Sequence, residues 1–257
     1  MTRVDVNCDL GESFGPWKMG RDEEIIPLVS SANIACGFHG GDPLVMQRTV
    51  ALVKKHGVAA GAHPGFPDLA GFGRRYMGLY PEEVKAAVQY QIGALDGFCR
   101  AAGIPLVHVK PHGALYNMAA KDMNLARAIA EAVKEINPRL ILLVLAGSCM
   151  AAAAKEAGLA AAQEVFADRA YEEDGSLSPR TKPGSMITCE DEALSRVVGM
   201  IQTGKVRAIT GKEISVTADS VCIHGDNEKA LVFAQKLTGA FAREGISVVP
   251  LSQICGV

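Results

Sequence analysis

Short apolar β-type runs alternate with longer helical patterns along the whole chain, and this alternation constrains the fold more than any other feature. Sustained alternation of this kind builds a parallel sheet covered by helices. At least seven repeats follow one another without a linker-like segment. We therefore expect the 257 residues to form one α/β domain, residues 1–257, folded as a single β/α barrel. A doubly wound open sheet is the alternative.

The positions of the elements follow from hydrophobic period and helix start signals. Asp42 as N-cap followed by Pro43 predicts a helix over residues 43–56, and Pro81 predicts a long helix over residues 81–102. The other helices are expected over residues 22–30, 122–136, 148–157, 190–202 and 227–244. Strands are expected over residues 4–8, 33–36, 57–62, 106–110, 140–145, 162–166, 220–224 and 247–249, with a small hairpin within residues 206–218.

Composition excludes several classes of protein. The formal net charge is −2 without a basic block, so we expect neither a nucleic-acid nor a membrane partner. The longest apolar runs, such as residues 140–146, are far too short to span a bilayer. The first residues carry acids where a signal peptide needs an apolar segment, which predicts a cytoplasmic protein. Seven scattered cysteines without a C-x-x-C pair argue against disulfides and a zinc knuckle.

Polar residues gather where the predicted strands end. In β/α barrels the carboxyl ends of the strands and the loops after them build the active site. Glycine or proline directly follows most of the histidines at these ends, which lets the backbone turn sharply and approach a ligand. Lys110 lies between His108 and His112 at a strand end, where its cation could hold a substrate carboxylate. The polar residues that stand just after a predicted strand and before the next helix are Asp9, Glu12, His39, His63, His112 and His224.

A metal site is one interpretation of these histidines. His108 and His112 have the i, i+4 spacing of a helical metal motif, but Pro111 excludes a helix interior. On a strand their imidazoles would stand about 13 Å apart, too far to share an ion. His108 is therefore interpreted as a supporting residue. A divalent metal held by Asp9, His39 and His63 remains open. A Walker phosphate loop and a G-x-S-x-G nucleophile motif are both absent.

Two further segments could contact a polar substrate. The loop over residues 168–185 is long for a connection in a barrel, and such loops are usually lids or disordered segments. Its polar residues Asp168, Arg169, Tyr171 and Arg180 favour a lid. The Arg74–Arg75 pair is either a solvated loop or an anion site.

Nine motifs in one order resemble the LamB/YcsF lactam-utilisation family over nearly the whole chain. They are DLGES at 9–13, NIACGFHGGDP at 33–43, GAHPGFPD at 61–68, GFGRR at 71–75, VKPHGALYN at 109–117, EVFADRAY at 164–171, DGSLSPR at 174–180, PGSMI at 183–187 and CIHGDN at 222–227.

The resemblance implies a fold and an activity. The fold would be a seven-stranded TIM-like barrel of the glycoside hydrolase/deacetylase type. The activity would be that of the A component of an ATP-dependent 5-oxoprolinase, a hydrolase that opens the lactam 5-oxoproline to glutamate. It implies ATP, with Mg²⁺, as cofactor and two further subunits, B and C, as partners.

The chemistry of lactam opening suggests roles for residues that stand within matching motifs. Asp9 with His112 would form the base pair, Lys110 and Arg169 would hold anions, and His39 and His63 would orient or donate. The expected catalytic residues are Asp9, His39, His63, Lys110 and His112. Those expected to bind substrate are Asn7, Glu12, Arg74, Asn117, Asp168, Arg169, Tyr171, Arg180, His224 and Asp226.

Two other functions stay open. One is a stand-alone metal-dependent amidohydrolase or deacetylase acting on a small amide or sugar. The other is a non-catalytic scaffold whose partners carry the chemistry. The density of polar groups at the strand ends speaks against a scaffold, because a scaffold needs no convergent imidazoles.

Overall fold

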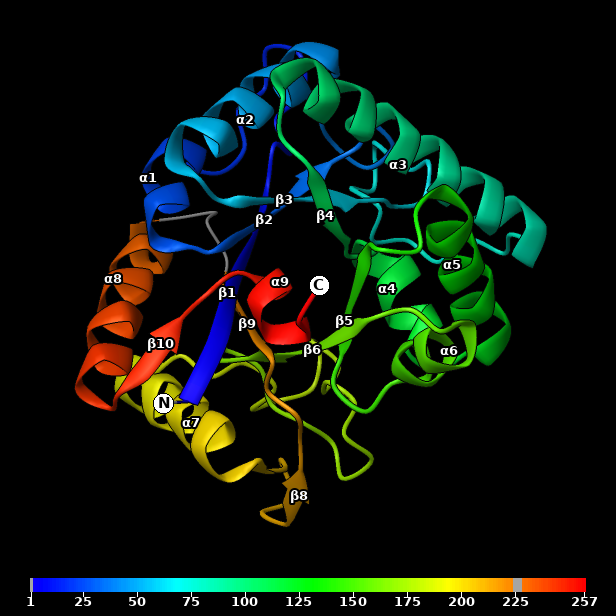
Figure 1. Ribbon diagram of the computed structural model, residues 1–257. Helices are drawn as coiled ribbons and strands as arrows, with labels where there is room; N and C mark the ends of the chain where they lie inside the picture. Colours follow the sequence, from blue (N-terminus) through cyan, green and yellow to red (C-terminus); the bar gives the residue numbers. More distant parts are fainter. Residues whose placement is uncertain (1, 224–227) are drawn as a thin grey trace.

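Seven parallel strands form a closed barrel in the computed structural model, which describes residues 2–223 and 228–257 (Figure 1). Strand β9 pairs with both β6 and β1, and this second pairing closes the sheet. A further strand, β10 (Ile246–Val248), adds to the first residues of β1. The barrel strands are β1 (Thr2–Leu10), β2 (Ser31–Ala35), β3 (Ala59–His63), β4 (Leu106–Val109), β5 (Ile141–Leu145), β6 (Ala161–Phe166) and β9 (Ser220–Ile223). The predicted seven-stranded barrel is confirmed.

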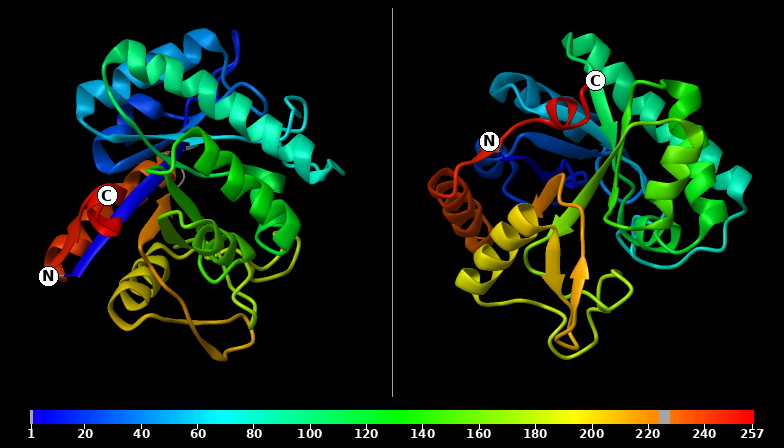
Figure 2. Two further views of the ribbon diagram at one scale, coloured as in Figure 1. Left: turned by 45° about the vertical axis from the view of Figure 1, so that its right-hand side comes forward. Right: turned by 60° about the horizontal axis from the view of Figure 1, so that its bottom comes forward.

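Helices surround the barrel on its outside (Figures 1 and 2). They are α1 (Asp22–Ile25), α2 (Pro43–His56), α3 (Pro81–Ala102), α5 (Met123–Ile136), α6 (Cys149–Ala157), α7 (Glu190–Thr203) and α8 (Glu228–Arg243). The proline signals predicted α2 and α3 to the residue. The Asp42 side chain caps α2 by accepting hydrogen bonds from the N–H groups of Leu44 and Val45.

Three elements differ from the prediction. The single helix expected over residues 22–30 is a short α1 followed by a 3₁₀ turn, η1 (Ile26–Leu28), because Pro27 has no N–H to continue an α-helix. Two short helices were missed, α4 (Gly113–Ala119) and α9 (Leu251–Cys255). The predicted hairpin is present as β7 (Lys205–Arg207) paired with β8 (Glu213–Ser215).

Strand β1 shows why the chain closes into a barrel with a polar interior. Apolar and polar residues alternate along it, and successive side chains of a strand point to opposite faces. Val4, Val6 and Cys8 are buried in the hydrophobic core between the strands and the helices. Asp5 and Asn7, also fully buried, hydrogen-bond to other strands across the barrel interior.

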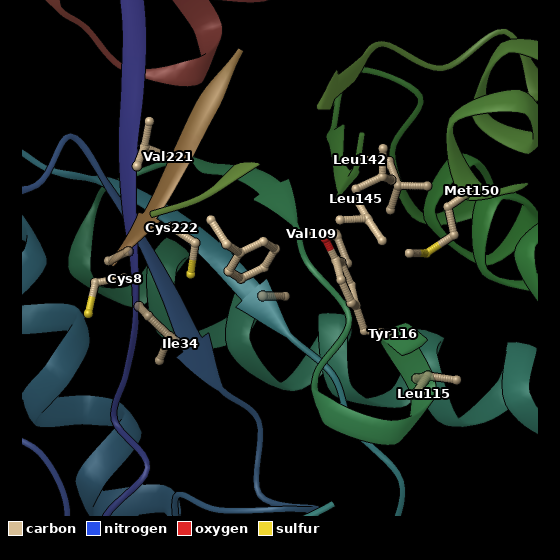
Figure 3. Packing of buried hydrophobic residues seen from close by; sticks show 14 of the residues in the cluster. Cys8, Ile34, Val109, Leu115, Tyr116, Leu142, Leu145, Met150, Val221 and Cys222 are labelled. Atoms are coloured by element: carbon tan, nitrogen blue, oxygen red, sulfur yellow. The ribbon is translucent and has the colours of Figure 1, made fainter. Parts of the chain in front are cut away.

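The core between barrel and helices is continuous and apolar. Figure 3 shows Leu142 and Leu145 of β5 pointing toward Tyr116 of α4 and Met150 of α6. All seven cysteines are free thiols. Among the described residues, no helix is long and apolar enough to cross a membrane.

Candidate functional site

A hydrogen-bonded polar layer fills the barrel below its carboxyl-terminal mouth. Asn7 on β1 accepts a hydrogen bond from Asn33 on β2 at 2.8 Å and donates to Ser220 on β9 at 2.8 Å. Asn33 in turn accepts from His108 Nε2 on β4 at 2.7 Å. All four side chains are fully buried, so these bonds satisfy groups that no water reaches. The layer therefore fixes four strands relative to one another.

A buried lysine lies at the centre of this layer. Lys110 Nζ is 3.1 Å from Asp9 Oδ1 and 3.1 Å from Glu164 Oε2. Glu164 also accepts a hydrogen bond from the Tyr116 hydroxyl at 2.5 Å. Burial alone lowers the pKa of Lys110, but the adjacent anions, Asp9 above all, hold it well above its usual range. Lys110 thus neutralises two carboxylates, an arrangement that does not favour its predicted role of holding a substrate carboxylate.

The layer has room for His108 because its neighbour on β3 is a glycine. A Cβ on Gly61 would lie 2.0 Å from His108 Nε2, inside the imidazole ring's own volume. The imidazole is fully buried, and burial followed by the nearby Lys110 charge lowers the pKa of His108 to about 3. His108 is therefore neutral at pH 7 and supports the layer, as the sequence predicted.

Four side chains from four successive strand ends converge at the mouth of the barrel: Glu12 after β1, His39 after β2, His63 at the end of β3 and His112 after β4. His63 Nε2 and His112 Nδ1 are 3.0 Å apart. Glu12 Oε1 lies 3.1 Å from His39 Nε2 and 3.4 Å from His112 Nδ1. The His39 and His112 rings stack with centroids 3.6 Å apart, and His63 stands perpendicular to both.

Backbone carbonyls hold two of these rings in place. The Nδ1 of His63 donates to the carbonyl of Lys110 at 2.7 Å, and the Nε2 of His112 donates to the carbonyl of Phe72 at 2.8 Å. Phe72 has φ +54°, the single non-glycine residue with positive φ in residues 2–223 and 228–257. Strain of this kind persists where the surrounding contacts hold it, often at functional sites. Next to it, a Cβ on Gly73 would lie 2.7 Å from the Cβ of His39.

The charges of this cluster are unevenly distributed. Burial would raise the pKa of Asp9, but His63 and Lys110 hold it well below its usual value. Burial lowers the pKa of His63, but the Asp9 carboxylate has the opposite effect, because its Oδ2 lies 3.3 Å from His63 Nε2. The net result is a raised pKa for His63. Burial lowers the pKa of His112 to about 3, with His39 and His63 adding to the effect. Burial also raises the pKa of Glu12.

The same four residues bring possible metal-ligand atoms close together. One ligand atom from each of Glu12, His39, His63 and His112 lies within 4.8 Å of the others. The set predicted from the sequence was Asp9, His39 and His63. The cluster shares His39 and His63 with it and contains Glu12 and His112, while Asp9 lies beside the cluster. The predicted base pair of Asp9 with His112 stays a prediction. In the structure Asp9 contacts His63, and the carboxylate beside His112 is that of Glu12.

The long loop after β6 folds back on itself. Arg169 pairs with Met186 and Tyr171 with Leu177 in isolated antiparallel bridges. Arg169 is 9% exposed and donates to the carbonyl of Ser178 at 2.6 Å. Tyr171 is fully buried, and its hydroxyl accepts the N–H of Phe166 at 2.9 Å. These two residues therefore anchor the loop, which leaves their predicted substrate contacts a prediction.

The other predicted substrate-binding residues lie on the surface or outside the described residues. Arg180 and Asn117 are exposed, and Asp168 is half-buried. Arg74 is exposed and lies over the Phe72 ring, 5.0 Å from its centroid, whereas its neighbour Arg75 is ion-paired with Asp68. His224 and Asp226 lie outside the described residues.

Two acidic groups of the polar layer were missed in the sequence. Glu164 is fully buried between Lys110 and Tyr116, and Asp5 accepts hydrogen bonds from Ser30 and Ser31. The polar alternation of β1 could have indicated Asp5, because it puts that carboxylate on the same face as Asp9.

Known proteins resemble the chain over nearly its full length. A family model described as the LamB/YcsF family matches residues 4–256. A protein from Clostridium beijerinckii, named as the A component of 5-oxoprolinase, is 62% identical over 254 residues, which cover 99% of this chain and 100% of that protein. The crystal structure of a lactam utilization protein from Thermus thermophilus is 53% identical with a TM-score of 0.91, covering 96% of this chain and 99% of that one.

A more distant structure shares the fold alone. It is a proposed cellobiose-phosphate cleavage protein from Enterococcus faecalis, 12% identical with a TM-score of 0.59, and the match covers 99% of both chains.

Proposed function

The chain belongs to the LamB/YcsF family, and from this membership we propose that it works as the A component of an ATP-dependent 5-oxoprolinase. The enzyme would add water across the lactam amide of 5-oxo-L-proline, giving L-glutamate, while ATP is hydrolysed to ADP and phosphate. Subunits B and C would be its partners, ATP with Mg²⁺ its cosubstrate, and the cytoplasm its location. The single observation that carries the proposal is 62% identity to such a component over nearly the full length of both proteins.

The chemistry explains why ATP is needed. A lactam is a resonance-stabilised amide, so water attacks its carbonyl slowly. Transfer of a phosphoryl group from ATP to the lactam oxygen would turn that oxygen into a leaving group and make the ring carbon electrophilic. Water then attacks this carbon, and opening of the C–N bond with proton transfer to the ring nitrogen would give an acyl phosphate of glutamate. A second water would hydrolyse this acyl phosphate and release glutamate and phosphate.

The barrel mouth offers suitable groups for the water and the ring nitrogen. The side chains of Asp9 and Glu12 are 23% and 17% exposed, whereas those of the three histidines are at most 6% exposed, so a substrate meets the carboxylates first. Asp9 is ionised at neutral pH, so its carboxylate can accept a hydrogen bond from the attacking water, orient it and take its proton as the new C–O bond forms. We assign Asp9 this role.

Reconstitution tests the proposal. Glutamate formation from 5-oxoproline is measured for the chain alone and with its two partner subunits, each with and without ATP. We expect turnover in the three-subunit mixture with ATP, and a loss of at least about a hundredfold in the Asp9→Asn and His112→Ala variants. His56→Ala, at the exposed end of α2, serves as the matched control and keeps full turnover.

The cluster of Glu12 and three histidines also favours a second candidate, a metal-dependent amidohydrolase that acts alone. Hydrolysis of a small amide by the chain alone, independent of ATP and abolished by a chelator, would support this candidate instead. If the complexes that contain the Asp9→Asn or the His112→Ala variant keep full turnover, the chain is a non-catalytic scaffold.

A further inference from the structure

The hydrogen bonds of two rim histidines fix which ring nitrogens carry protons. The carbonyl oxygens of Lys110 and Phe72 can only accept hydrogen bonds. His63 must therefore carry a proton on Nδ1, and His112 must carry one on Nε2. The nitrogens left over, His63 Nε2 and His112 Nδ1, face each other at 3.0 Å.

Two neutral rings in these tautomers would point lone pair at lone pair. This arrangement is repulsive unless a positive charge lies between the two nitrogens. A negative group stands at the same point, because Glu12 Oε1 is 3.4 Å from His112 Nδ1 and 4.0 Å from His63 Nε2. With His63 neutral, two imidazole lone pairs and a carboxylate oxygen surround one position. The alternative occupant is a proton on His63 Nε2, which His112 Nδ1 at 3.0 Å or Asp9 Oδ2 at 3.3 Å would accept.

The size of this triangle suits a small divalent ion. Bonds of about 2.0–2.2 Å from an ion to nitrogen and oxygen ligands place neighbouring ligand atoms about 3.0 Å apart in an octahedron and about 3.4 Å apart in a tetrahedron. The three separations of 3.0, 3.4 and 4.0 Å are close to that range. Small movements of the partly exposed Glu12 side chain would close the longest one.

His39 has a different position. Its ring is stacked on that of His112 with 2° between the planes and 3.6 Å between the centroids. The in-plane lone pairs of the two rings therefore lie in separate parallel planes and cannot both point at one ion. The Nε2 of His39 is instead 3.1 Å from Glu12 Oε1 and can donate to it. Donors of this kind orient a metal-binding carboxylate and tune its affinity.

We propose that Glu12, His63 and His112 form a divalent first-row metal site at the barrel mouth, and that His39 orients Glu12 through a hydrogen bond. Two imidazoles and one carboxylate suit Zn²⁺, Fe²⁺, Mn²⁺ or Co²⁺ and leave further positions open. Asp9 lies outside this set. Its Oδ1 accepts hydrogen bonds from Lys110 and Asn33, and its Oδ2 lies beside the proposed ion, 3.3 Å from His63 Nε2.

Direct binding measurements test the site without any enzymatic assay. The chain is freed of metal by chelation, and calorimetric titrations with Zn²⁺ and with Co²⁺ are recorded at pH 7.5. We expect one ion per chain, with a visible Co²⁺ spectrum that lacks the thiolate charge-transfer band. This last feature separates the site from binding by the seven free cysteines.

Variants assign the ligands. His63→Ala and His112→Ala should each weaken binding at least a hundredfold, and His39→Ala should weaken it by about 10–100-fold, the usual effect of a residue that orients a ligand. His56→Ala removes an exposed histidine away from the mouth and should leave the affinity unchanged.

Two results would overturn the proposal. One is the absence of stoichiometric binding in the wild-type chain, which means that a proton alone separates His63 from His112. The other is equal affinity in the wild type and in the His63→Ala and His112→Ala variants. If the alanine variants do not fold by circular dichroism, the near-isosteric Glu12→Gln decides instead, and unchanged affinity there counts against the site. Because the chain is measured alone, the outcome is independent of the oxoprolinase assignment.

Discussion

Lys110 illustrates how single residues govern this barrel. Its ammonium group is buried and lies between the carboxylates of Asp9 and Glu164. Removing one partner of a buried ion pair leaves the other charge without compensation, which usually costs more than the pair itself contributes. The polar layer is therefore sensitive to the loss of any one charged member.

Lys110→Met should lower the free energy of unfolding by about 3–5 kcal/mol, because the carboxylates of Asp9 and the fully buried Glu164 would lose their cationic partner. Urea denaturation at pH 7 measures the change. Lys212→Met is the matched control, since the exposed pair between Lys212 and Glu173 should contribute less than about 1 kcal/mol. Similar losses in both variants would contradict the role assigned to Lys110.

His108 should make the protein sensitive to acid. Its pKa is about 3 when folded, whereas an unfolded histidine titrates near 6.5, so below pH 6.5 the unfolded chain binds more protons and stability falls with pH. The stability that His108 contributes is complete above pH 6.5 and is lost progressively down to pH 3. This amounts to about 3 kcal/mol between pH 7 and pH 4.

His108→Gln tests this, because glutamine keeps a donor for Asn33 but does not titrate in this range. Unfolding free energies of both proteins are compared from pH 7 to pH 4, and the loss should be about 3 kcal/mol smaller in the variant. Burial raises the pKa of Asp5 to about 6, so Asp5 also titrates in this window, but it does so in both proteins. Parallel pH profiles would show that folding does not lower the pKa of His108.

At the scale of elements, local signals were predicted well and non-local pairings were not. Helices α2 and α3 were predicted to the residue because proline and capping residues mark their starts within the sequence itself. The five residues of α9 are too few for a helical period to be visible. Glu164 was missed for a related reason, since its partners Lys110 and Tyr116 come from other parts of the chain and only barrel closure brings them together.

The gathering of the rim histidines was predictable for the opposite reason. A parallel barrel brings all the carboxyl ends of its strands to one mouth, so a residue's place at a strand end determines its neighbours. His39, His63 and His112 were placed in this way. Which carboxylate would join them was not predictable, because Asp9 and Glu12 stand in the same strand end and only side-chain direction separates them.

The pairing of β3 with β4 depends on the glycine at position 61. Gly61→Ala should lower the free energy of unfolding by about 1–3 kcal/mol, because the new methyl group would overlap the His108 imidazole. Gly93→Ala, within α3 and with open space around it, should instead raise stability by about 0.5–1 kcal/mol. Thermal and urea unfolding measure both.

A double variant shows whether the clash is specific. When His108 is already alanine, the space at position 61 is open, so Gly61→Ala should cost much less than it does in the wild type. Equal costs in the two backgrounds would mean that the methyl group disturbs the backbone of β3 rather than the imidazole.

At the scale of the whole molecule, the two ends of the barrel are built differently. The carboxyl-terminal end holds the charged mouth and the polar layer beneath it. At the other end, α9 contacts β1, β4, β5 and β6, and it lies at the middle of the view in Figure 1. Its Leu251 packs in a separate apolar cluster with Ile141, Leu143 and Ala162. Helix α9 thus closes the barrel from below without touching the site.

This separation predicts that stability and binding can be changed independently. Leu251→Ala should lower the free energy of unfolding by about 2–5 kcal/mol, because it opens a cavity at a fully buried position. Val257→Ala, at a side chain that is 60% exposed, should change it little. Urea denaturation measures both variants. Affinity for Zn²⁺ at the mouth should be unchanged in Leu251→Ala under conditions where it is fully folded, because the polar layer lies between the helix and the ion. A parallel loss of affinity would show instead that the two ends of the barrel are mechanically coupled through its strands.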